Sequence, residues 1–123
     1  MYTLDTNTIL YYQKEEENVV TILENLFGEN TPMYVSAVTE AELFRYSNLT
    51  QDEAWRIGVF LRSVSVIPVD SRIARIAGTV GRKYGVRLAD SIVGATALFT
   101  GSAVLTRNVR DFKRIKGLRV ERI

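Results

Sequence analysis

Residues 88–106 read LADSIVGATALFTGSAVLT, and this stretch carries the clearest structural pattern in the chain. Its first thirteen residues are almost all apolar, which predicts a helix over Leu88–Thr100 that is buried on most of its sides. The apolar run Ala103–Thr106 that follows predicts a short strand. A helix followed by a short strand is the alternation from which covered parallel sheets are built.

The same alternation extends through the rest of the chain. Strands are expected at Tyr2–Leu4, Met33–Ser36, Val64–Val69, Ala103–Thr106 and Leu118–Ile123. Helices are expected over about residues 6–12, 18–27, 37–46, 51–62, 71–84, 88–100 and 109–115. This order predicts an α/β protein whose mainly parallel sheet is covered on both faces. With 123 residues and neither a linker nor a repeat, a single domain over residues 1–123 is expected.

The composition excludes several classes of protein. With 46% apolar residues and a net charge of +2, the chain is too hydrophobic and too weakly charged to be disordered. No apolar run approaches the ~20 residues of a membrane span, and no secretory signal is visible, so a cytoplasmic protein is expected. The absence of cysteine excludes disulfides and thiol chemistry, and the absence of histidine removes the commonest general base.

The small net charge hides a division along the chain. Residues 1–71 hold 4 basic and 11 acidic side chains, whereas residues 72–123 hold 12 basic and 3 acidic ones. Twelve of the 16 basic residues are arginine, which suits bidentate contact with phosphate. The basic part indicates either a nucleic-acid partner, bound or cut, or simply a solvated surface.

Three acidic residues stand where predicted strands end or predicted helices begin. Asp5 follows the first strand, where it either caps the next helix or holds a cation at the sheet edge. Glu42 lies three residues after Thr39, the spacing of a capping box, and spacing alone favours this structural role. Asp90 lies in the first turn of the apolar helix, where the helix dipole, a metal ion or Arg87 would stabilise it.

A cluster of polar residues also follows the strand Ala103–Thr106. It offers the Thr106 hydroxyl, the Asn108 amide and the Asp111 carboxylate, with Arg107 and Arg110 between them. These residues form either a capped short helix with a basic face or a phosphate site beside a metal ion. Together with the acids above they predict an all-oxygen pocket, which selects Mg²⁺ or Mn²⁺ over zinc.

These motifs resemble the PIN-domain family, and within it the VapC-type toxin ribonucleases of type II toxin–antitoxin pairs. The resemblance covers nearly the whole chain and rests mainly on four motifs, which occur in the same order as in the family. They are residues 4–7 (LDTN), Ser36–Thr39 with Glu42 and Leu43, residues 88–97 (LADSIVGATA) and residues 105–112 (LTRNVRDF). Residues 115–121 (IKGLRVE) are also similar to the family's C-terminal strand.

The resemblance implies a PIN-like three-layer α/β/α sandwich with about five strands and a Mg²⁺- or Mn²⁺-dependent endoribonuclease. It also implies a homodimer and a small VapB-type antitoxin as protein partner. Asp5, Glu42 and Asp90 match the family's acids. The fourth acid is either Asp111 or absent, with Asn108 orienting a water. Where many relatives carry Gly, this chain has Tyr46, a departure that bears on helix packing or on substrate fit.

The expected chemistry is hydrolysis of RNA phosphodiester bonds. Asp5 and Asp90 would hold the principal ion, and Glu42 and Asp111 would act on it directly or through water. The supporting residues would be Thr6, Asn7, Thr106 and Asn108, and the phosphate contacts would be Arg87, Arg107 and Arg110.

Two other functions fit parts of the pattern. A phospho-acceptor receiver domain has a similar length, an acid cluster and Mg²⁺, but it usually needs two adjacent acids after the first strand, and this chain has only Asp5 there. A non-catalytic PIN-like module that binds nucleic acid or protein is the second, because Asn108 is an amide where some relatives have an acid. Cleavage of RNA with Mg²⁺ or Mn²⁺ separates this module from the nuclease.

Overall fold

The computed structural model describes residues 1–123, and its elements follow the predicted alternation closely. The strands are β1 (Tyr2–Leu4), β2 (Met33–Ser36), β3 (Ser65–Ile67), β4 (Ala103–Thr106) and β5 (Val120–Arg122). The helices are α1 (Thr6–Gln13), α2 (Glu17–Gly28), α3 (Ala37–Phe44), α4 (Gln51–Arg62), α5 (Ser71–Tyr84), α6 (Leu88–Thr100) and α7 (Val109–Phe112). None of these helices is long and apolar enough to cross a membrane.

Four elements are shorter than expected. Strand β3 covers only residues 65–67 of the predicted 64–69. It ends before Pro68, which has no N–H to donate to the sheet. Strand β5 is likewise shorter, and both lie at the edges of the sheet, where a strand pairs on one side only. Helices α3 and α7 end before residues 46 and 115, so Tyr46 lies in a loop.

The five strands form one sheet in the order β3-β2-β1-β4-β5, and every neighbouring pair is parallel. The predicted parallel α/β architecture is therefore confirmed. The chain adds strands on one side of β1 and then crosses to its other side with β4, so the strand order reverses beside β1. Ligands of open parallel sheets bind outside the carboxyl ends of the strands at such a reversal.

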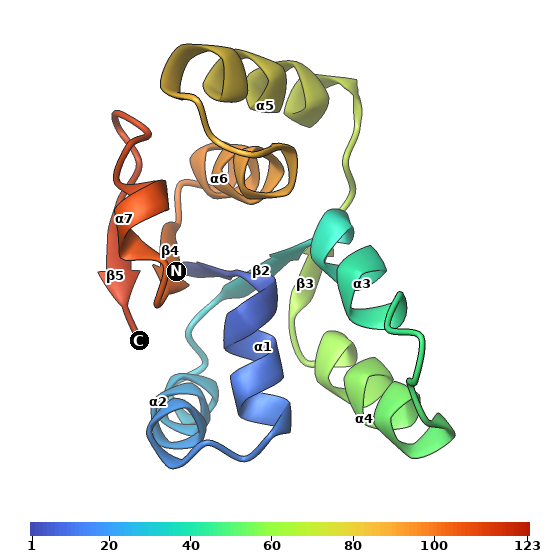
Figure 1. The fold of residues 1–123 in the computed structure, drawn as a ribbon. Helices are drawn as coiled ribbons and strands as arrows, with labels where there is room; N and C mark the ends of the chain where they lie inside the picture. Colours follow the sequence, from blue (N-terminus) through green and yellow to red (C-terminus); the bar gives the residue numbers. More distant parts are fainter.

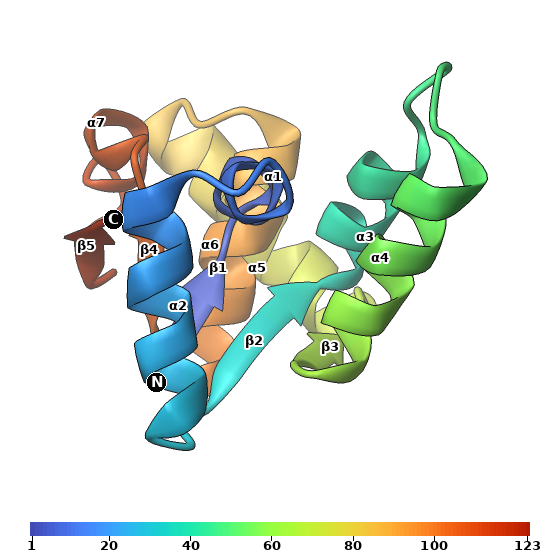
Figure 2. The same ribbon diagram turned by 90° about the horizontal axis from the view of Figure 1, so that it is seen from below.

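Helices cover both faces of this sheet. Figure 1 shows α5 and α6 on one face and α1 and α2 on the other, which gives three layers. Figure 2, seen from below, shows α3 and α4 beside β2 and β3. Helix α6 packs on β1, β2 and β4, and α5 packs on α6. The short chain segments that leave β1, β2 and β4 thus all emerge at one edge.

Alternating side chains of the central strands fill the cores on the two faces. Leu4, Val35 and Leu105 are in register across β1, β2 and β4 and belong to the larger core, which packs against α1, α2 and α4. Val104 points to the opposite face and joins the core beneath α6. The two-residue period of the strands explains this division. It anchors the strand ends from which the polar side chains project.

The prediction that α6 is buried on most sides is correct only for its middle. Residue Ser91 and residues 93–97 are buried, since the sheet lies on one side of them and α5 on another. Leu88 at the first position is 73% exposed, and Leu98 and Phe99 are exposed at the other end. The guanidinium of Arg72 covers part of the Phe99 ring, 4.9 Å from its centroid. An apolar sequence therefore does not bury the ends of this helix.

Candidate active site

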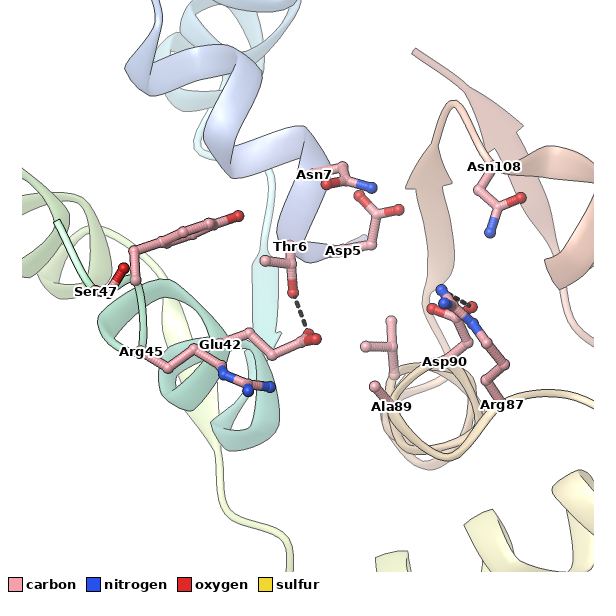
Figure 3. A pocket seen from close by; sticks show the side chains of 12 residues that line it. Asp5, Thr6, Asn7, Glu42, Arg45, Ser47, Arg87, Ala89, Asp90 and Asn108 are labelled. Carbon is pink, nitrogen blue, oxygen red and sulfur yellow. Dashed lines mark hydrogen bonds and ion pairs between the residues drawn. The ribbon is translucent and has the colours of Figure 1, made fainter. Parts of the chain in front are cut away.

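A pocket of about 680 Å³ lies at the carboxyl edge of the sheet, beside β1. It brings together Asp5 after β1, Glu42 of α3, Asp90 of α6 and Asn108 after β4. Figure 3 shows these four side chains around one open space, although the sequence separates them widely. Of the predicted supporting residues, Thr6, Asn7 and Asn108 line this pocket and Thr106 does not.

Asp5 both caps a helix and faces the pocket, so its two proposed roles are compatible. It is the N-cap of α1, where Oδ1 accepts a hydrogen bond from the backbone N–H of Thr8 at 2.9 Å. Its other oxygen, Oδ2, accepts one from the Thr106 hydroxyl at 2.5 Å. Asp5 is only 6% exposed. These two bonds fix the carboxylate at the end of the central strand.

Glu42 does not form the capping box that its spacing from Thr39 suggested. Ser36 caps α3 instead, and its hydroxyl accepts from the backbone N–H of Val38 at 3.1 Å. Oε1 of Glu42 accepts a hydrogen bond from the Thr6 hydroxyl at 2.6 Å, drawn in Figure 3. The structural interpretation of Glu42 is therefore wrong, because Thr39 lies inside α3 and cannot be its N-cap, while the Glu42 carboxylate faces α1.

Asp90 is the third residue of α6, and Arg87 lies beside it. The Arg87 guanidinium is 3.4 Å from Oδ2 of Asp90, and it is itself largely exposed. Burial raises the pKa of Asp90; Arg87 opposes this rise, while the charges of Asp5 and Asp111 add to it. Asp90 thus feels the negative charges of Asp5, in the pocket, and of Asp111 nearby, and a bound cation would relieve this repulsion.

Asn108, and not Asp111, lines the pocket, but the two residues form one unit. The Asn108 side-chain amide donates to Oδ2 of Asp111 at 3.0 Å. The backbone N–H of Asn108 donates to Oγ1 of Thr106 at 2.8 Å, and that hydroxyl in turn donates to Asp5. A chain of hydrogen bonds therefore links Asp111 to Asp5 through Asn108 and Thr106.

The donor atoms of the pocket fit a hard cation better than a soft one. They are carboxylate, amide and hydroxyl oxygens, the ligands preferred by Mg²⁺ and Mn²⁺. No three acidic side chains lie close enough together to hold one ion between them. Because Mg²⁺ usually keeps several waters and takes only one or two carboxylates, this spacing suits an ion bound partly through water.

The predicted phosphate-binding arginines divide into two groups. Arg87 lines the pocket. Arg107 does not: its guanidinium pairs with Glu16 and lies over the Tyr11 ring, 4.4 Å from the centroid. Arg110 is almost fully exposed and lies 3.6 Å from Asp111. Only Arg87 of the three is placed for direct contact with a phosphate in this pocket.

Sequence reasoning missed one wall of the pocket. Arg45, the C-cap of α3, and Ser47 line it together with Tyr46, and Ala89 and Val93 complete it from α6. The only signal for this wall was the departure at Tyr46 from the family's usual Gly. Tyr46 has an ordinary negative φ, so the backbone there does not require Gly.

The fold and the pocket together define a doubly wound α/β protein with a carboxylate site at the point of strand reversal. The model of the PIN domain family matches residues 2–118, and the chain belongs to this family. The family and the fold expected from the sequence motifs are therefore confirmed.

Several proteins of known name are similar to this chain over nearly its whole length. The chain is 26% identical over 117 residues to Ribonuclease VapC19 of Mycobacterium tuberculosis, covering 91% of this chain and 92% of that protein. It is 26% identical over 128 residues to the tRNA(fMet)-specific endonuclease VapC of Salmonella typhimurium, covering 98% and 96%. The crystal structure of DNA-bound VapBC from Salmonella typhimurium has a TM-score of 0.85 at 26% identity, covering 98% of this chain and 96% of that one.

Proposed function

We propose that this protein is a divalent-metal-dependent ribonuclease that hydrolyses RNA phosphodiester bonds. The observation that carries the proposal is the convergence of Asp5, Glu42, Asp90 and Asn108 on one pocket with arginines on its walls. Acidic oxygens suit a hard cation, and the arginines suit a phosphate. The names of the similar proteins, a ribonuclease and a tRNA endonuclease, support the same activity.

The acids divide the work by position. Asp5 and Asp90 would hold the principal Mg²⁺ or Mn²⁺, with Glu42 and Asp111 contributing directly or through water. When bound, such an ion neutralises phosphate charge and activates water, so neither histidine nor cysteine is needed.

Other side chains hold these acids and the substrate. Thr106 keeps Asp5 in place by its hydrogen bond, and Thr6 does the same for Glu42. Arg87 and Arg45 would contact the phosphates on either side of the scissile bond, because they line opposite parts of the pocket wall.

We also propose that the protein is the toxin of a toxin–antitoxin pair, acts in the cytoplasm and forms a homodimer. Two similar solved structures, each at 26% identity, are those of DNA-bound VapBC from Salmonella typhimurium and of FitAcB from Neisseria gonorrhoeae. An apolar surface supports a protein partner. Trp55 is 66% exposed, and it lines a cavity of about 610 Å³ with Phe27, Val59 and Phe60.

The test is cleavage of defined single-stranded RNAs by the full chain, with and without Mg²⁺ or Mn²⁺. Asp90→Asn is expected to abolish cleavage. Asp70→Asn makes the same chemical change at an exposed helix cap, where Asn caps equally well, and it should leave cleavage unchanged. RNA that binds but stays intact with either metal ion would show a non-catalytic module instead.

A further inference from the structure

A second pocket adjoins the acidic one. It has a volume of about 360 Å³ and lies between the end of α1, the loop from α3 to α4, and the beginning of α4. Tyr46 and Ser47 line both pockets, so the two cavities share a wall. A strand of RNA with its phosphate in the acidic pocket would therefore have this second pocket directly beside it.

The second pocket combines an apolar side with unpaired polar side chains. Leu10, Leu49 and Ile57 form its apolar part. Gln13 and Asn48 also line it, and neither side chain makes a hydrogen bond within the protein. An amide presents both a donor and an acceptor, the pattern that reads the edge of a nucleobase.

The charged residues around this pocket leave little net charge for a phosphate. Glu53 closes a capping box with Thr50, and Arg56 pairs with Asp52 at 3.2 Å. Lys14 is the remaining cation, and it is exposed. The pocket therefore suits a neutral, flat group with polar edges better than it suits an anion.

Tyr46 stands where the two pockets meet. Its side chain is 51% exposed, and its hydroxyl makes no hydrogen bond within the protein. An exposed aromatic ring beside a phosphate site is a platform on which an unpaired base stacks. Arg45 precedes it in the chain, lines the acidic pocket and has no acidic partner, so it is free to hold the adjoining phosphate.

We propose that the second pocket binds one unpaired nucleobase of the RNA, next to the scissile phosphate, with Tyr46 stacking on it and Gln13 and Asn48 reading its edge. The inference rests on the proposed ribonuclease function and deepens it, since it makes this pocket a determinant of sequence preference. A paired base would not fit, because its polar edge would already be occupied by its partner.

Cleavage of a randomised single-stranded RNA pool tests the reading of the base. The unchanged protein should show a base preference at one position beside the cut. Asn48→Ala and Gln13→Ala should flatten that preference, whereas Asn25→Ala, the same change on an exposed part of α2, should keep it. An unchanged preference in the first two variants overturns the inference. So does a loss of antitoxin binding in these variants with the base preference intact, because the pocket would then belong to a protein partner.

The stacking role has its own test. Tyr46→Ala should lower kcat/KM by about 5-fold to about 150-fold, the range expected for loss of one base–aromatic stack, while Tyr46→Phe should retain most of the activity. Equal kcat/KM for Tyr46→Ala and the unchanged protein would overturn the role of the ring.

A binding measurement separates this inference from the proposed function. A short RNA with one 2-aminopurine is mixed with the full chain in EDTA, where no cleavage is expected. The unchanged protein should quench its fluorescence and Tyr46→Ala should not. Quenching without any cleavage on adding Mn²⁺ would refute the ribonuclease and keep the base pocket. Cleavage without quenching, or cleavage together with equal quenching by both proteins, would refute the base pocket and keep the ribonuclease.

Discussion

Replacing Thr106 by valine should both destabilise the protein and impair its active site. The two side chains have nearly the same shape, so the change removes a hydroxyl and little else. That hydroxyl donates to Oδ2 of Asp5 at 2.5 Å and accepts from the backbone N–H of Asn108 at 2.8 Å. Thr106 is fully buried, so water cannot easily replace either bond.

The expected cost follows from these two bonds. A hydrogen bond to a charged group contributes about 1.5–3 kcal/mol, and an unpaired buried N–H costs about 1–3 kcal/mol. Allowing for the favourable burial of the added methyl group, about 0.8 kcal/mol, the net loss should be about 3 kcal/mol. For a chain of 123 residues this corresponds to a fall in Tm of roughly 10 °C.

The assay is urea unfolding followed by circular dichroism, with RNA cleavage measured on the same preparations. Thr106→Ser is the matched control, since it keeps the hydroxyl and loses one methyl group, at a cost of about 1 kcal/mol. Cleavage by the valine variant should fall well below that of the serine variant. If the valine variant is as stable and as active as the serine variant, the hydrogen-bonded hydroxyl does not position Asp5, and the reasoning is refuted.

Three further results are expected. The folded-state pKa of Asp90 lies above its ordinary value of 3.8, so the stability it contributes is present below pH 3.8 and is lost as the pH rises through the folded pKa. Without metal, Asp90→Asn should therefore unfold at a higher urea concentration than the unchanged protein at pH 7, and the difference should vanish near pH 3. Thr50→Ala, which removes the capping box with Glu53, should cost about 1 kcal/mol in urea unfolding, and an unchanged unfolding midpoint would contradict this. Arg87→Ala should raise KM for RNA more than Arg107→Ala does, because Arg107 is already paired with Glu16, and equal KM values would count against that assignment.

The elements of the fold and two residues of the pocket, Asp5 and Asn108, were predictable because each depends on a local pattern. Helix α6 and strand β4 follow from one apolar stretch, and Asp5 and Asn108 follow strands whose carboxyl ends meet at one edge. The parallel sheet then brings them together without further information.

Other features depend on contacts that no local pattern encodes. Thr39 to Glu42 and Thr50 to Glu53 both have capping-box spacing, but only the second of these pairs begins a helix. Spacing could not decide between them, because Ser36 had already taken the cap of α3.

The direction of Arg107 and the place of the loop that carries Tyr46 depend on tertiary contacts in the same way. Arg107 is held by Glu16, 91 residues away in the chain, so its direction is set by tertiary contacts. The loop that carries Tyr46 has neither helical nor strand periodicity, and its place beside Asp5 follows from how α3 ends and α4 begins.

The central position of β1 has a consequence for biosynthesis. Its pairing with β2 can form early, because residues 2–4 and 33–35 are made close together in time. Its other edge stays open until residues 103–105 are made, and the Asp5 carboxylate has no Thr106 hydroxyl until then. On a growing chain Asp5 therefore lacks its Thr106 partner until β4 has been made, so the order of translation itself delays the completion of the pocket.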